Sequence, residues 1–128
     1  MSHIVTVRTK VRDPAALAAA CRRLGLGAPA AGVAQLYSGP AEGLLVSLPG
    51  WRYPVVFDTA TGEARFDHFE GRWGDPTVLD RLLQAYAIEK VRLEARRRGH
   101  TLTEQPLPDG SVRLVLHAGQ SPEVGGAT

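Results

Sequence analysis

The chain has 128 residues, of which 44% are hydrophobic and 22% are charged, the usual balance of one folded globular domain. Fifteen lysines and arginines face thirteen aspartates and glutamates, and the net charge of +2 is too small for the basic footprint of a nucleic-acid-binding protein. The single cysteine allows no internal disulfide, and no apolar run reaches the roughly 18 residues of a membrane span, so we expect a cytoplasmic protein with no nucleic-acid or membrane partner.

Apolar periodicity and turn residues divide the chain into a regular series of elements. In chain order they predict a strand over residues 2–10, a helix over 15–24, strands over 33–38 and 42–48, a hairpin with strands over 54–58 and 63–69, a long helix over 77–98, and a last hairpin with strands over 101–107 and 112–117. Helices and strands of this kind, mixed along one chain, indicate the α+β class.

Local signals mark where these elements begin and end. An Asp-Pro pair stands before each helix, at residues 13–14 and 75–76, and glycines at 25 and 99 are typical helix ends. Residues 39–41, 59–62 and 108–111 carry the glycines and prolines expected of the three hairpin turns. Asp58 is placed to accept hydrogen bonds from the backbone amides of the second turn.

The order of elements predicts a ferredoxin-like β-α-β-β-α-β core with an inserted β-hairpin and a C-terminal hairpin. Both helices would then cover one face of a single antiparallel sheet. We expect residues 1–117 to form one α+β domain. Residues 118–128 are rich in glycine and small side chains without periodicity, and we expect a disordered tail there.

Histidine and cysteine spacing predicts neither a metal site nor a cofactor. The four histidines stand at residues 3, 68, 100 and 117, in different elements, and no pair has the spacing of zinc or iron ligands. His3 falls on the apolar side of its strand. The simplest interpretation is a neutral imidazole ring that is hydrogen-bonded to a backbone group. Cys21 has Arg22 and Arg23 as neighbours, but it lacks a base and we expect a buried helix cysteine.

The most unusual composition lies in two short segments that flank the second hairpin, the one with strands over residues 54–58 and 63–69. Trp51, Arg52 and Tyr53 precede it, Arg72 and Trp73 follow it, and antiparallel pairing brings the two segments together at its base. Trp, Tyr and Arg are the residue types enriched at binding hot spots. The alternative is that both indoles seal the end of a small core and the arginines stack on them.

The long helix carries a second apolar stripe opposite the one expected to face the sheet. Ile88, Val91 and Ala95 recur on that side, with Ala87, where a solvated helix would be polar. Something apolar should cover them, either a second copy of the chain in a homodimer or the terminal hairpin of the same chain.

Several runs of the sequence resemble a family of uncharacterised proteins that includes the product of hypothetical chloroplast open reading frame 35 and its bacterial relatives. The similar segments are MSHIV at residues 1–5, YSG at 37–39, LPGWRYPVV at 48–56, DTATGE at 58–63, GRWGD at 71–75 and LLQAYA at 82–87. The family has no agreed function and no agreed catalytic residues. The resemblance implies a small adaptor or partner subunit, with an AAA-type ATPase as one partner.

Together these observations predict a non-enzymatic accessory or adaptor protein that binds a protein partner through a Trp/Arg/Tyr surface. The alternative is an enzyme or small-ligand-binding protein with a pocket at the base of the hairpin over residues 54–69. In that case Asp67, His68 and Arg72 would supply the polar groups of the pocket.

Overall fold

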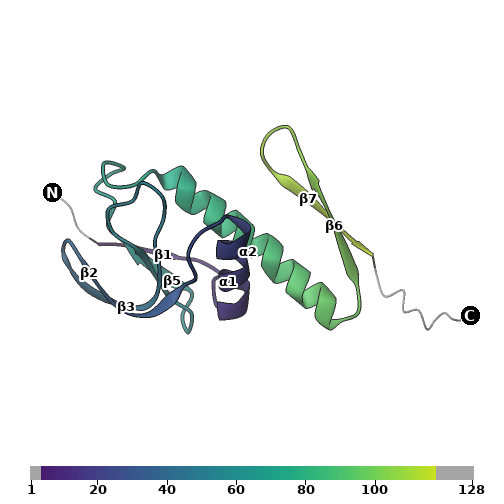
Figure 1. Cartoon of the computed structure of the whole chain (residues 1–128), viewed down its shortest axis with the longest axis horizontal. Coiled ribbons are helices and arrows are strands. Elements are labelled where there is room, and N and C mark those ends of the chain that lie inside the picture. The colour runs from purple at the N-terminus through teal and green to yellow at the C-terminus, as the bar shows by residue number, and fades with distance from the viewer. Residues whose placement is uncertain (1–3, 118–128) are drawn as a thin grey trace, which may run out of the picture. The chain divides into compact units, whose positions relative to one another are not determined.

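The computed structural model describes residues 4–117, which form two helices, a five-stranded antiparallel sheet and a separate two-stranded hairpin (Figure 1). The elements are β1 (Val5–Arg8), α1 (Pro14–Arg23), β2 (Ala30–Leu36), β3 (Gly39–Val46), β4 (Val55–Asp58), β5 (Glu63–Phe66), α2 (Pro76–Arg97), β6 (Thr101–Pro106) and β7 (Val112–His117). The α+β class is therefore confirmed. The expected tail over residues 118–128 and His3 lie outside the described residues.

The described chain forms two compact units that divide within α2, between Ala87 and Ile88. The first unit holds the five-stranded sheet and α1, and the second holds β6 and β7. None of the helices within residues 4–117 has both the length and the apolar character needed to cross a membrane.

The strand order of the sheet is β1-β5-β4-β3-β2, and every neighbouring pair is antiparallel. The ferredoxin-like topology is not confirmed by this order, because the strands after α2 pair with each other and not within the five-stranded sheet. The hairpin of β4 and β5, expected as an insertion, lies inside the sheet, where it joins β1 to β3 through backbone hydrogen bonds.

The Asp-Pro pairs start both helices as predicted. The Asp13 carboxylate accepts hydrogen bonds from the amides of Ala15 at 3.0 Å and Ala16 at 3.3 Å, which would otherwise lack partners in the first turn of α1. Asp75 does the same for Thr77 at 3.0 Å at the start of α2. This hydrogen bond lowers the pKa of the Asp75 carboxyl, so the cap stabilises the helix above the ordinary carboxyl pKa and weakens as the solution is acidified.

The first hairpin turns two residues earlier than expected. Its turn consists of Tyr37 and Ser38, because Leu36 pairs with Gly39 and the pairing continues to Ala30 and Leu45. Pro40 lies within β3 and not in the turn, since β4 pairs with β3 only from Leu44 onward and no neighbour requires the missing amide of the proline. The expected turn at residues 39–41 was wrong, and Tyr37 stands at the hairpin tip.

The second hairpin has the predicted turn over residues 59–62. The Asp58 carboxylate accepts from the amide of Ala60 at 3.0 Å, and the Gly62 amide donates to the Asp58 carbonyl at 2.7 Å. Gly62 has φ of +82°, and a Cβ there would lie 2.6 Å from the carbonyl oxygen of Thr9. Only glycine satisfies both demands, so this turn also fixes the chain that leaves β1.

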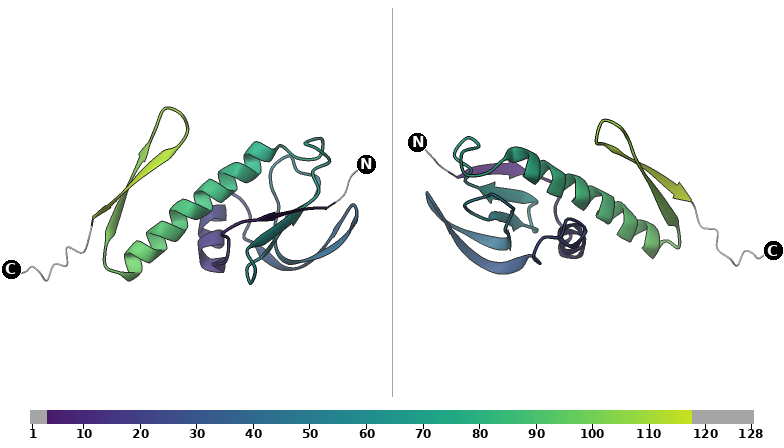
Figure 2. Two further views of the ribbon diagram at one scale, coloured as in Figure 1. Left: turned by 180° about the vertical axis from the view of Figure 1, so that it is seen from behind. Right: turned by 45° about the horizontal axis from the view of Figure 1, so that its top comes forward.

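The core of the first unit is formed by side chains from its own strands and from both helices. Its largest fully buried side chains are Phe57, Leu17, Leu36, Leu82, Val11, Val46, Val55 and Val56. Leu79, Leu82 and Tyr86 are buried, and they belong to the main apolar stripe of α2, the side expected to face the sheet. A second cluster forms where the β2–β3 hairpin curls (Figure 2), and there Ala34, Leu36 and Ala41 pack with Val56, against Tyr53.

The second unit contains residues 88–117, with the predicted turn at 108–111. The Asp109 carboxylate accepts from the Ser111 amide at 2.9 Å and hydroxyl at 2.6 Å, and Arg92 pairs with Glu104 of β6. Of the three expected oligomer contacts, Ile88 and Ala95 are buried, whereas Val91 is 39% exposed. A homodimer through this stripe stays a prediction, with Val91 as its exposed member.

A single tyrosine hydroxyl of α2 holds the start of α1. Tyr86 is 4% exposed, and its oxygen accepts hydrogen bonds from the backbone amides of Arg12 and Asp13, each at 3.1 Å. These two amides precede the first turn of α1 and have no helical acceptor. The aromatic ring completes the main stripe of α2, and its polar tip orients the other helix.

Replacing Tyr86 by phenylalanine should lower the free energy of unfolding by about 1–3 kcal/mol, because two backbone amides lose their acceptor. Urea denaturation followed by circular dichroism measures this change. Tyr37→Phe is the matched control, since Tyr37 is exposed and its hydroxyl makes no hydrogen bond within residues 4–117. Equal stability of the Tyr86→Phe variant and the wild type would contradict the assignment.

Candidate functional site: an arginine and aromatic surface

The two segments that flank the second hairpin meet, as predicted. The Arg52 amide donates to the Trp73 carbonyl at 2.8 Å, which joins the β3–β4 connection to the β5–α2 connection. The Trp73 amide in turn donates to the His68 carbonyl at 2.8 Å. Backbone hydrogen bonds therefore fix the positions from which both tryptophans and both arginines project.

Trp51 has a structural role. Its ring lies 5.7 Å from that of Phe66 and 5.8 Å from that of His68, and its indole N–H donates to the Asp75 carbonyl at 3.1 Å. The indole also covers the backbone of Gly74, where a Cβ would lie 2.3 Å from Trp51 Cδ2. Trp51 thus seals the end of the core and fixes the residue that caps α2.

Gly74→Ala should displace the Trp51 indole and lower the free energy of unfolding by about 1–3 kcal/mol, the usual cost of overpacking a buried site. Chemical denaturation gives the energy, and tryptophan fluorescence reports the displaced ring. Gly27→Ala is the control, because no atom lies within 4 Å of a Cβ built there. If both variants unfold alike, the close approach of Trp51 to Gly74 is refuted.

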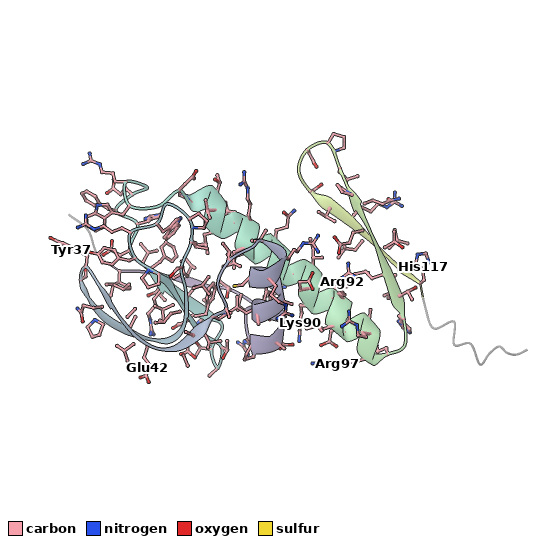
Figure 3. All side chains as sticks on the ribbon, viewed as in Figure 1. Tyr37, Glu42, Lys90, Arg92, Arg97 and His117 are labelled. Carbon is pink, nitrogen blue, oxygen red and sulfur yellow. The ribbon has the colours of Figure 1, made fainter. Side chains whose placement is uncertain are left out.

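Trp73 gathers aromatic and basic side chains around its indole. Ring centroids lie 5.2 Å away for Tyr37, 5.6 Å for Tyr53 and 4.7 Å for Phe69, and the Arg52 guanidinium stands 4.9 Å above the ring. Tyr37 reaches Trp73 from the tip of the β2–β3 hairpin (Figure 3). It remains 61% exposed, so this cluster reaches the protein surface.

A second arginine completes the arrangement. The Arg72 guanidinium lies 5.1 Å from the Phe69 ring, so successive contacts join Arg52, Trp73, Phe69 and Arg72 in the order cation, ring, ring and cation, which we call the row. Both arginines are exposed, and neither forms an ion pair within residues 4–117. We call these six residues the Arg–aromatic surface: Tyr37, Arg52, Tyr53, Phe69, Arg72 and Trp73.

The loop that presents this surface contains strained backbone. Phe69 has φ of +49° and Glu70 has φ of +53°, and the Gly71 amide donates to the His68 carbonyl at 3.0 Å. This is a tight turn with two left-handed residues, a conformation that usually requires glycine or asparagine. Strain of this kind concentrates at functional sites, and here it positions Arg72 and Trp73 directly after the turn.

Glu70→Asn should raise the free energy of unfolding by about 0.5–1 kcal/mol, because asparagine tolerates the left-handed conformation better than glutamate. Denaturant titration measures the gain. Glu70→Ala removes the same charge without this preference and should bring no gain. A stabilised alanine variant would show that the charge of Glu70, and not its backbone angle, limits stability.

The polar groups expected of an alternative pocket do not converge. Asp67 is fully buried and Arg72 stacks on Phe69. His68 lines a pocket of about 290 Å³ between β1, β5 and the first turns of α2, together with Phe66 and apolar residues of α2. Neither Asp67 nor Arg72 belongs to its wall. The pocket therefore has one of the three predicted polar side chains.

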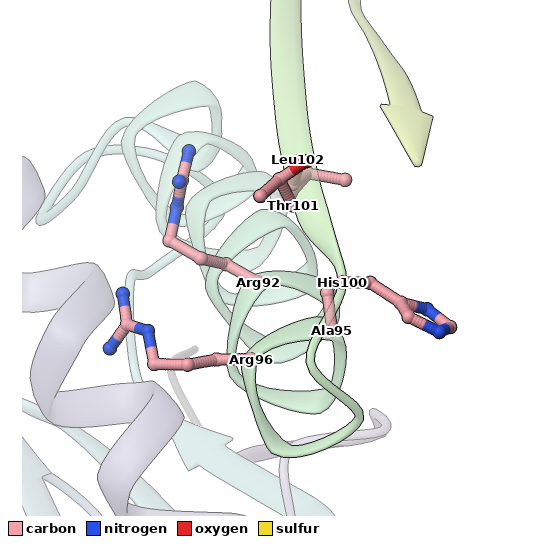
Figure 4. Close-up of a pocket in the computed structure, with 6 residues that line it drawn as sticks. All are labelled: Arg92, Ala95, Arg96, His100, Thr101 and Leu102. Carbon is pink, nitrogen blue, oxygen red and sulfur yellow. The ribbon is translucent and has the colours of Figure 1, made fainter. Parts of the chain in front are cut away.

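A further pocket, of about 380 Å³, lies in the second unit (Figure 4). Arg92 and Arg96 project from one side of α2, whereas His100 projects the other way. Arg92 is already paired with Glu104. The three basic side chains therefore do not converge on a common anion-binding site.

His68 packs against Trp51, which is not part of the Arg–aromatic surface, and its carbonyl accepts the hydrogen bond from the Trp73 amide. Cys21 is fully buried in α1, as predicted, and burial raises the pKa of its thiol. Within residues 4–117, no three metal-ligating side chains come together. The absence of a structural metal stays a prediction.

Sequence reasoning missed two members of the Arg–aromatic surface. Phe69 was expected at the end of a strand, about opposite Trp51, and nothing in its spacing indicates the left-handed turn. Tyr37 was placed inside a strand, because Gly39 and Pro40 suggested a later turn. An aromatic residue directly before a Ser-Gly pair is the sequence signal that would have found it.

Comparison with known proteins adds no relative. No protein-family model matches the chain. No curated protein matches it significantly, and no solved structure does so either.

Proposed function

We propose that the chain is a non-enzymatic binding module, an accessory or adaptor protein that holds a protein partner on the Arg–aromatic surface. The observation that carries this proposal is Tyr37, which remains 61% exposed although its ring packs on Trp73. Large aromatic side chains held in place at the surface are typical of interaction sites, because they offer apolar area at little further cost in conformational entropy.

The chemistry of the site favours binding over catalysis. Its charged groups are two guanidiniums placed over rings, its other polar side-chain groups are the tyrosine hydroxyls and the indole N–H, and the six residues include no serine, cysteine, histidine, lysine or carboxylate. A small-ligand function remains the second candidate, supported by the apolar pocket beside His68. The resemblance to the open reading frame 35 family makes an AAA-type ATPase a partner to look for.

Tyr37→Ala should abolish or strongly reduce the capture of a specific partner while leaving thermal stability unchanged. Tyr37 stands at a hairpin tip and is mostly exposed, so its loss removes contact area without disturbing the core. The tagged protein is used to capture partners from an extract of cells that encode it, and quantitative mass spectrometry compares the variants. Trp51→Ala is unsuitable here, because Trp51 also anchors Asp75.

Val33→Ala is the matched control for this experiment. Val33 is 62% exposed on β2 of the same hairpin and lies outside the Arg–aromatic surface. A partner that both variants lose equally, or that neither loses, contradicts the proposed surface. Retained partners together with tight binding of a small molecule that requires Leu79 or His68 would favour the pocket.

A further inference from the structure

The arrangement of the two arginines indicates what kind of partner the surface recognises. Each guanidinium lies over an aromatic ring, Arg52 over Trp73 and Arg72 over Phe69. Cation–π contact orients the planar group but uses its face, so the N–H donors at its edge stay available. A planar fork of this kind matches a carboxylate in a two-point hydrogen bond.

The described structure provides no carboxylate for either group. Neither Arg52 nor Arg72 makes an ion pair or a side-chain hydrogen bond within residues 4–117, although other arginines do, such as Arg65 with Glu63 and Arg97 with Glu94. Glu70 lies in the same loop and is exposed, but it pairs with neither arginine. Two oriented and unpaired cations therefore flank an apolar platform.

We propose that the Arg–aromatic surface recognises an acidic peptide segment of the partner, in which two carboxylates flank an apolar side chain. This inference rests on the proposed binding function and names the chemistry of the partner. The carboxylates bind at Arg52 and Arg72, and the apolar side chain lies on Phe69 and Trp73 between them.

The three contact distances along the row set an upper limit on the spacing of the two carboxylates. The row of Arg52, Trp73, Phe69 and Arg72 has three steps of about 5 Å. An extended peptide advances about 3.3 Å per residue, so the two acidic residues stand no more than about four positions apart. Two adjacent acidic residues leave no apolar side chain between them, and in an extended peptide their side chains point to opposite faces.

Binding of defined peptides, followed by nuclear magnetic resonance at low ionic strength, tests this proposal. The probe is the blocked peptide Glu-Ala-Leu-Ala-Glu, and the observed signals are the two indole N–H resonances. We expect the Trp73 resonance to shift, whereas the Trp51 resonance stays in place because its N–H is bonded to Asp75. The glutamine analogue and the isomer Ala-Glu-Glu-Leu-Ala should bind more weakly.

Variants of the protein assign the effect to the two arginines. Arg52→Gln and Arg72→Gln should each weaken binding of the glutamate peptide about five-fold, in line with one exposed but oriented ion pair. Arg22→Gln is the control, because it removes the same charge from the exposed end of α1. It should leave the affinity unchanged.

The outcomes separate this inference from the proposed function. No shift with the glutamate peptide, equal binding of the glutamine analogue, or an Arg22→Gln effect equal to that of Arg52→Gln overturns acidic recognition. In these cases the proposed function still stands if Tyr37→Ala loses its captured partner. Stronger shifts of Trp73 with a single-stranded oligonucleotide than with the glutamate peptide would overturn the inference in favour of a nucleic-acid surface.

Discussion

The contact between the Trp51 indole and the Gly74 backbone is the constraint on which the link between the sheet and the helices of the first unit depends. It joins the connection before β4 to the connection after β5, and the indole N–H holds the carbonyl of Asp75. Asp75 caps α2, and Tyr86 on that helix holds the start of α1. The Trp51 ring, packed on the backbone of Gly74, thus connects the hairpin base to both helices.

The two tryptophans have different roles, one in the core and one at the surface. The sequence alone could not show which tryptophan has which role. Trp51 packs inward on Phe66 and His68, whereas Trp73 lies among the exposed groups Tyr37 and Arg52. Exposed cation–π contacts stabilise by only about 0.5–1 kcal/mol each. The stack therefore contributes little to stability. Its effect is to restrict the side chains before a partner arrives.

Elements that depend on local chemistry could be predicted from the sequence, and those that depend on distant pairing could not. The helix starts at Asp13 and Asp75 follow from caps within a few residues. The strand order depends on hydrogen bonds between β1 and β5, which lie more than fifty residues apart and leave no local signal. The turn at Tyr37 was misplaced because Pro40 is normally a turn residue, and its tolerance in β3 depends on where β4 ends.

The candidate site, too, has features that could be predicted from the sequence and features that could not. Pairing across the hairpin was enough to predict that Trp51 and Trp73 lie near one another. Which indole faces the core could not be predicted, because the left-handed turn at Phe69 and Glu70 breaks the alternation of strand faces. Tyr37 joins the cluster only because the β2–β3 hairpin curls over Val56.

The buried thiol of Cys21 provides a chemical probe of the opening of the structure around α1. Burial raises the pKa of the thiol and keeps it out of reach, so a sulfhydryl reagent reacts with it only while the structure around α1 is open, locally or by unfolding of the whole unit. Because the chain has a single cysteine, every modification event reports that one movement. The rate of labelling therefore reports how readily the structure around α1 opens, under native conditions and without any denaturant.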